Sequence, residues 1–147
     1  MAKYCLAYIA TAIVFLGLDF TWLSQMQSIL YKPALGSLLS PSPSIGPAFL
    51  FYLIYFIGVV FFCVAPALRL DRWRTALLNG ALFGLCAYAT YDLTNQATLR
   101  IWSTRITVVD LAWGATVTAV AATSGFLITR LMVRKSSKAS QQARTTG

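Results

Sequence analysis

The sequence predicts an all-α integral membrane protein, built as a four-helix bundle. Of its 147 residues, 58% are hydrophobic and only 11% are charged, whereas soluble domains average about 45–50% apolar and about 25% charged residues. The mean hydropathy is +0.68. Four stretches of the chain are long and apolar enough to cross a bilayer, which requires about 20 such residues. Composition and segment length together give the fold class.

The predicted spans form one transmembrane domain, residues 1–133, with helices at about 4–23, 48–68, 75–97 and 106–132. The second span, AFLFYLIYFIGVVFFCVAPAL, carries no charge. Between the first two spans, the first half of Ser24–Pro47 is compatible with a short helix in the membrane interface. Its second half, SPSPSIGP, is predicted to be a loop because proline and serine favour turns. The polar, basic tail, residues 134–147, is predicted to be disordered and cytoplasmic.

Lysine and arginine are distributed unequally between the two ends of this bundle. Nine of the twelve fall at Lys3, in the connection 69–74 and from Arg130 onward, and three fall in the other connections. Cytoplasmic flanks carry the excess of positive charge, so both termini are predicted to be cytoplasmic. The net charge of +8 is then a topology signal that also favours anionic membrane lipid as a partner, and nucleic acid is not predicted.

Several kinds of chemistry find no support in the residues. The chain has no histidine, which removes the commonest general base and the commonest metal ligand. Cys5, Cys63 and Cys86 lie far apart and form no C-x-x-C pair, so neither a zinc site nor a redox motif is indicated. No metal or other cofactor is predicted. No catalytic set is recognisable either, which disfavours an enzyme.

Three of the four acidic residues, Asp19, Asp92 and Asp110, lie inside predicted spans. Even a lenient scale assigns about 2.5–3.5 kcal/mol to a charged side chain at the centre of a membrane helix. Each aspartate is four or five residues from the end of its helix that faces away from the basic flanks. At 1.5 Å per residue, each would lie about 6–7 Å below the outer surface. We therefore predict one outward-facing carboxylate cluster at a common depth.

The neighbours of these acids complete a candidate binding site. Trp22 follows Asp19 by three residues and Trp113 follows Asp110 by three, spacings that put each pair on one helix face. Tyrosine and tryptophan at this depth are also ordinary residues of the membrane interface. Arg100 and Arg105 flank the short outer connection and are candidate partners for the acids. The candidate binding residues are Asp19, Trp22, Tyr91, Asp92, Asn95, Asp110 and Trp113.

The third span contains Gly80-x-x-x-Gly84, a pattern that allows two helix backbones to approach closely. Packing within one bundle is the favoured interpretation, ahead of dimerisation. A homodimer is nonetheless expected if the protein is a transporter, because four helices make a small one.

The strings AYATYDLTNQATLR and ITVVDLAWG resemble the core signature of a bacterial membrane family, domain of unknown function 2177. YCLAYIATAIVFLGLDFTWL and FYLIYFIGVVFFCVAPAL are also similar to it, so the resemblance covers roughly Tyr4–Leu131. Eight positions carry the motifs: Asp19, Trp22, Tyr91, Asp92, Asn95, Asp110, Trp113 and Gly114. The resemblance implies a four-helix protein of the bacterial inner membrane with no established activity. It also implies a genomic association with lipid-modifying enzymes.

Three functions remain open at this point. The favoured one is an outward-facing acidic site that binds or transports a small cation, a cationic solute or a lipid headgroup. The first alternative is a membrane-embedded enzyme or accessory protein in lipid modification, in which one carboxylate serves as acid and another as base. The second alternative is a structural subunit whose aspartates only hold the helices together.

Overall fold

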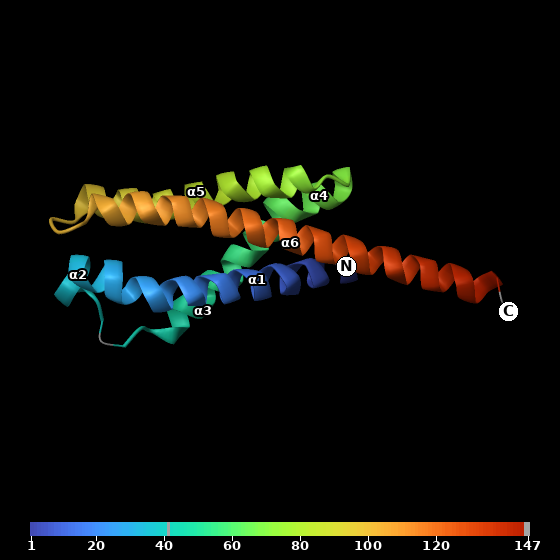
Figure 1. Cartoon of the computed structure of the whole chain (residues 1–147), viewed down its shortest axis with the longest axis horizontal. Helices are drawn as coiled ribbons and strands as arrows, with labels where there is room; N and C mark the ends of the chain where they lie inside the picture. Colours follow the sequence, from blue (N-terminus) through green and yellow to red (C-terminus); the bar gives the residue numbers. More distant parts are fainter. Residues whose placement is uncertain (41, 146–147) are drawn as a thin grey trace.

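The structure is a computed structural model that describes residues 1–40 and 42–145, without the side chains at positions 37, 137–141 and 143–145. It is all-α, as predicted, with four long helical segments (Figure 1). The first comprises α1 (Ala2–Met26), the π-helical turn η1 (Gln27–Tyr31), α2 (Lys32–Leu35) and the 3₁₀ turn η2 (Gly36–Leu38). The second comprises α3 (Ile45–Val59), the π-helical turn η3 (Val60–Val64) and α4 (Ala65–Leu70). The remaining two are α5 (Trp73–Thr98) and α6 (Thr104–Thr145).

Three helical stretches in the described part of the chain are long and apolar enough to cross a membrane: Ala2–Leu35, Ile45–Leu70 and Thr104–Ser136. The remaining predicted span, the third at 75–97, corresponds to α5. This helix has 26 residues, enough to cross a bilayer, but it is not among the three stretches that are also apolar enough.

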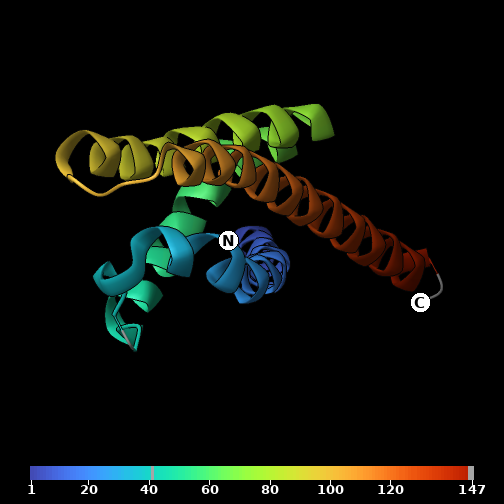
Figure 2. The same ribbon diagram turned by 60° about the vertical axis from the view of Figure 1, so that its left-hand side comes forward.

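Helices α5 and α6 form an antiparallel pair along the length of α5, and α1 packs against α6 (Figures 1 and 2). The segment α3–η3–α4 crosses this group obliquely. At the crossing, η3 contacts α1, α5 and α6. The apolar core gathers around it: Val59, Cys63 and Val64 are fully buried there, and Phe15 and Phe56 belong to the same cluster.

Glycine allows α5 and α6 to approach closely, as the Gly80-x-x-x-Gly84 pattern predicts. A Cβ atom on Gly84 would lie 2.0 Å from the carbonyl oxygen of Gly114, and one on Gly80 would lie 2.9 Å from the Cα of Ala119. Both contacts are with backbone atoms of α6, which cannot move aside as a flexible side chain can. The glycine pair is therefore used within the bundle.

The two π-helical turns each end two residues before a proline, Pro33 after η1 and Pro66 after η3. Proline has no N–H group, so the carbonyl four residues earlier loses its helical donor. For Pro66 that carbonyl belongs to Phe62, and Asn79 of α5 donates to it from its side-chain amide at 2.9 Å. A broken backbone bond in a spanning helix is thus satisfied by a neighbouring helix.

Two helices continue beyond the segments expected from the sequence, one into the first connection and one into the tail. The first helix continues to Leu35, so the expected interfacial helix is an extension of α1; Pro41 of the predicted loop lies outside the described residues. At the other terminus, α6 continues to Thr145 where a disordered tail is predicted from residue 134. The stretch 127–145 has no glycine or proline, and adding turns to a nucleated helix costs little. Residues 146–147 lie outside the described part.

Candidate functional site

The three aspartates of the predicted spans are all buried. Asp92 and Asp110 lie toward the α5–α6 connection, and Asp19 lies near the middle of the first helical stretch, Ala2–Leu35. Asp19 is 5% exposed, Asp92 1% and Asp110 7%. Each is delivered by a different helix: α1, α5 and α6. We refer to these three residues as the acidic row.

Asp19 accepts hydrogen bonds from two other helices. The Tyr52 hydroxyl of α3 donates to Oδ2 at 2.6 Å, and the Trp113 indole N–H of α6 donates to Oδ1 at 3.2 Å. Hydrogen bonds to a charged acceptor are stronger than those between neutral groups. Asp19 therefore joins α1, α3 and α6 at a single carboxylate.

Asp110 is held by the turn that follows α1. The Tyr31 hydroxyl at the end of η1 donates to Asp110 Oδ1 at 2.6 Å, and the Trp22 indole N–H donates in turn to the Tyr31 oxygen at 3.3 Å. The π-helical turn continues the first helix up to Tyr31 and brings this ring over α6. A π-helical turn inside an α-helix is frequently found at a functional site.

The two tryptophans of the repeated D-x-x-W spacing meet face to face. The rings of Trp22 and Trp113 are stacked, with centroids 4.2 Å apart and planes inclined by 7°. Because each indole also donates to a partner in the network, the stack links the Asp19 bonds to the Asp110 bonds. The tryptophans of the two D-x-x-W pairs are thus in direct contact.

Asp92 differs from the other two acids. It is the most buried of the row, and neither of its carboxylate oxygens has a hydrogen-bond partner among the described residues. A buried polar group without a partner is uncommon in proteins, and each case calls for an explanation. Asp92 faces a neighbouring negative charge as well, since Asp110 lies within electrostatic range.

The acids are staggered along α6 and do not share the single depth that the sequence suggests. Thr11 of α1 lies opposite Gly125 of α6. These helices are antiparallel, so Asp19, eight residues after Thr11, is level with Val117, eight residues before Gly125. Asp110 lies seven residues further along α6 toward the α5–α6 connection. The backbone of Asp19 is therefore about 10 Å deeper in the bundle than that of Asp110.

Asp92 lies on the other side of Asp110. Gly84 of α5 lies opposite Gly114 of α6, so Asp92, eight residues after Gly84, is level with Ile106 of the antiparallel α6. Ile106 is four residues from Asp110. The Asp92 backbone therefore lies about 6 Å nearer to the α5–α6 connection than that of Asp110. The acidic row thus runs Asp19, Asp110, Asp92 over about 16 Å of the bundle axis. The common-depth estimate counts from predicted helix ends. It fails for Asp19 because the first helix extends well past its predicted end, and the offset of Asp92 from Asp110 comes from the register of α5 against α6.

None of the row is paired with arginine or lysine among the side chains that the structure describes. The ion pairs there join Asp71, at the opposite end of the bundle, to Arg130 and Arg134. Arg100 and Arg105, the candidate partners from sequence, form no ion pair with the row. Tyrosine hydroxyl groups and a tryptophan indole donate to Asp19 and Asp110, where the sequence suggested arginine.

The remaining candidate residues lie on α5 beside Asp92. Tyr91 is 62% exposed, and its ring packs edge-on against Trp102 with centroids 5.8 Å apart. Asn95 is half-buried, one turn beyond Asp92. The structure therefore unites Asp19, Trp22, Asp110 and Trp113 through direct contacts, and the Tyr91 ring contacts Trp102, outside that network.

Sequence reasoning missed Tyr31 and Tyr52, which supply the shortest bonds to the acids. One signal was available for Tyr52, since a hydroxyl in an otherwise apolar span needs an acceptor. Tyr55 obeys the same rule and pairs with Thr118 at 2.7 Å. Nothing in the local sequence identifies which acceptor each tyrosine reaches.

The row is not arranged as a shared metal site. Within the described residues, no three His, Cys, Asp or Glu side chains are placed to hold one metal ion. The stagger of the acids explains this, because the ends of the row are too far apart for one ion to contact both.

Comparison with known protein families identifies the chain. The model of a family of predicted membrane proteins, domain of unknown function 2177 (DUF2177), matches residues 4–127. The chain belongs to the DUF2177 family. The match covers every predicted span almost completely and includes the whole acidic row. This DUF2177 chain is accordingly a multi-pass membrane protein, and the resemblance noted in its motifs is confirmed. No curated protein and no solved structure matches it.

Proposed function

We propose that this DUF2177 protein binds a positively charged ligand, a small cation or a cationic organic group, along its acidic row. The site would face the periplasm from the bacterial inner membrane, since the excess of Lys and Arg lies at the opposite end. The observation that carries the proposal is Asp92, a fully buried carboxylate with no partner among the described residues.

A buried carboxylate in a membrane protein is neutralised either by a proton or by a positive charge. Asp19 and Asp110 receive neutral donors, which stabilise a carboxylate without cancelling its charge. Asp92 receives none, and it repels Asp110. A cation beside Asp92 would remove both costs at once.

The spacing of the row favours a particular ligand class. A divalent metal ion needs several oxygen ligands converging on one point, and the row provides one carboxylate at each level. A monovalent cation or an ammonium group can be satisfied by a single carboxylate with neighbouring polar groups. The outer faces of the Trp22–Trp113 stack add aromatic surface for a cation–π contact.

The proposal is tested by ligand-induced stabilisation of the full chain in detergent. Sodium, tetramethylammonium, ethanolamine and magnesium chlorides are titrated at constant ionic strength, and the melting temperature is recorded. A ligand at 100 times its Kd stabilises by about 2.7 kcal/mol. We expect one of the monovalent cations to give a saturable shift that Asp92→Asn abolishes. Asp71→Asn removes the fourth aspartate, at the other end of the bundle, and should leave the shift intact.

Two results would reject the proposal: an Asp92→Asn protein that keeps the full shift, or equal loss in both aspartate variants. A response to magnesium alone would contradict the inferred ligand class.

A structural role is the second candidate for two members of the row. Asp19 links α1 to α3 and α6 through its bonds to Tyr52 and Trp113, and Asp110 anchors η1 through Tyr31. This network favours helix attachment for Asp19 and Asp110. In that case Asp19→Asn and Asp110→Asn lower the melting temperature without ligand, and only Asp92→Asn changes the response to cations.

A further inference from the structure

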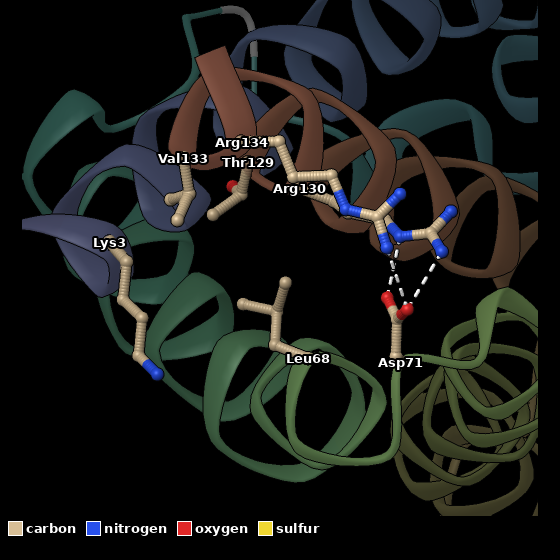
Figure 3. A pocket seen from close by; sticks show the side chains of 7 residues that line it. All are labelled: Lys3, Leu68, Asp71, Thr129, Arg130, Val133 and Arg134. Carbon is tan, nitrogen blue, oxygen red and sulfur yellow. Dashed lines mark hydrogen bonds and ion pairs between the residues drawn. The ribbon is translucent and has the colours of Figure 1, made fainter. Parts of the chain in front are cut away.

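A second polar site lies at the opposite end of the bundle, between the start of α1, the end of α4 and the last membrane turns of α6. A cavity of ≈ 220 Å³ opens there. Figure 3 shows it with Lys3 on one wall and the paired Asp71, Arg130 and Arg134 on the other. This volume is large enough for several water molecules or one small polyatomic ion.

Local backbone geometry places Asp71 against α6. Asp71 ends α4 in the left-handed conformation, with φ 51°, which aspartate tolerates better than most residues. Its Oδ2 accepts from Arg130 at 2.8 Å and from Arg134 at 2.9 Å, two residues on one face of α6. The Arg130 hydrogen bond lowers the pKa of the Asp71 carboxyl, so this group is charged at neutral pH.

The cavity has a positive balance despite that pairing. Three cationic side chains, Lys3, Arg130 and Arg134, line it against the single carboxylate of Asp71. A guanidinium group carries five N–H donors in a planar fork, and Arg134 gives one hydrogen bond to Asp71. Asp71 therefore holds both guanidinium groups in place, and most of their N–H groups are left to bind another acceptor.

The cavity also contains an unsatisfied polar group and an apolar wall. Thr129 lines it with a fully buried side chain, and its hydroxyl has no hydrogen-bond partner among the described residues. Leu68 and Val133 supply apolar lining. A hydroxyl donor, guanidinium groups and an adjacent apolar surface together suit an amphiphile with an anionic head.

We propose that this cavity binds a phosphate group, supplied by the headgroup of an anionic phospholipid. Arg130 and Arg134 provide the charge-assisted hydrogen bonds that phosphate oxygens accept, Lys3 closes the site from α1, and Thr129 donates from its floor. The apolar wall then runs toward the lipid acyl chains. The site is separate from the acidic row and is independent of the function proposed for it.

The experiment uses the full chain in detergent and native mass spectrometry. Phosphatidylglycerol is titrated against diacylglycerol with the same acyl chains, which lacks the phosphate. The pocket variant is Lys3→Gln/Arg134→Gln, and the matched control is Arg74→Gln, a cation at the same end that does not line the cavity. We expect saturable retention of phosphatidylglycerol over diacylglycerol, weakened about tenfold or more in the pocket variant, since a charge-assisted bond contributes on that order. The control variant keeps wild-type retention.

Thr129→Val provides a second arm that does not depend on charge. Because its hydroxyl is buried without a partner, this change should leave the melting temperature of the lipid-free protein unchanged or raise it, while weakening phosphatidylglycerol retention. Inorganic phosphate is added in a third arm; displacement of the lipid at millimolar concentration identifies a soluble phosphate as the natural source. Equal losses in the pocket variant and in Arg74→Gln, or no loss in either, would overturn the proposal.

Discussion

Asp19 and Asp110 take their hydrogen bonds from tyrosine and tryptophan, whereas Asp71 at the other end takes its bonds from two arginines. The difference follows from where each acid lies. Placing a guanidinium beside a carboxylate inside the bundle would require a second charge to be desolvated. A phenol or an indole brings a donor without that cost, because its ring is already apolar.

Removing one phenol donor should destabilise the protein measurably. Tyr31→Phe and Tyr52→Phe are each expected to lower the free energy of unfolding by about 1–2 kcal/mol, because each leaves a buried carboxylate with one donor fewer. Thermal unfolding in detergent, followed by circular dichroism, measures the change. Tyr91→Phe serves as the control, since its exposed ring does not contact the acids, and it should stay within about 0.5 kcal/mol of wild type. Indistinguishable melting of all three variants would contradict the role assigned to these bonds.

The aspartates of this network can be recognised from the sequence, but the tyrosines that donate to them cannot. An aspartate in an apolar span is conspicuous on its own, because its cost depends only on its surroundings. Tyr52 is 33 positions from Asp19 in the chain, and Tyr31 is 79 positions from Asp110. No local pattern encodes a pairing over such separations, so Tyr31 and Tyr52 appear only with the tertiary structure.

At the scale of helices, α5 depends on close approach to α6. Gly84 and Gly114 face each other with no space for a side chain, and the Tyr88 ring covers Gly114. Asp92 is positioned by this contact, because it lies two turns beyond Gly84 on the same helix. The geometry of the acidic row therefore rests on a small-residue interface that is itself apolar.

Gly84→Ala should separate the two helices. A Cβ atom there would meet the Gly114 carbonyl oxygen at 2.0 Å, so backbone must shift, and overpacking of this kind costs about 1–3 kcal/mol or more. Gly17→Ala is the matched control, since nothing lies within 4 Å of its Cβ position; as a change in a helix interior it should stabilise by about 0.5–1 kcal/mol. Equal effects in equilibrium unfolding would show that α5 and α6 are not held in this register.

Pro66 and Asn79 take part in a second contact between helices, which joins the second helical segment to α5. Pro66 removes the helical donor from the Phe62 carbonyl, and Asn79 replaces it. This contact lies where the second helical segment crosses α5, so the kink and the crossing are coupled.

A double-mutant cycle tests that coupling. Asn79→Leu alone should lower the free energy of unfolding by about 1 kcal/mol, because the Phe62 carbonyl is left without a donor. In a Pro66→Ala background the helix regains a backbone N–H, so the same change should cost less, with a coupling energy of about 0.5–1 kcal/mol. An additive cycle, measured by denaturant unfolding, would contradict the compensation.

At the scale of the whole molecule, Lys3, Arg130 and Arg134 line one cavity, so the N-terminus and the end of the α6 span lie at the same end of the bundle. The acidic row begins near the middle of the bundle with Asp19 and runs through Asp110 and Asp92 toward the other end. The bundle is thus asymmetric along its axis: the acidic row lies from its middle toward the α5–α6 connection, and Lys3, Arg130 and Arg134 line the cavity at the opposite end with Asp71.

The positive-inside rule predicts that the basic end is cytoplasmic. In a variant whose three native cysteines are replaced, Ser42→Cys should react with a membrane-impermeant maleimide added to spheroplasts. Ser136→Cys, at the opposite end, should react only after the membrane is permeabilised. Labelling of Ser136→Cys in intact spheroplasts, with protection of Ser42→Cys, would invert the orientation and remove the periplasmic assignment of the acidic row.

The sequence by itself determined the membrane class, the all-α architecture, the helices that carry the acids and the family. These properties depend on composition and on short-range periodicity, both readable along the chain. The tertiary structure decided the rest: the tyrosine partners, the stacked tryptophans, the stagger of the row and the isolation of Asp92. Helix register and packing set these features, and they arise from contacts between residues far apart in the chain. An error of several residues in one helix end hid the depth of Asp19, and the register of α5 against α6, which the helix ends do not reveal, sets the offset of Asp92.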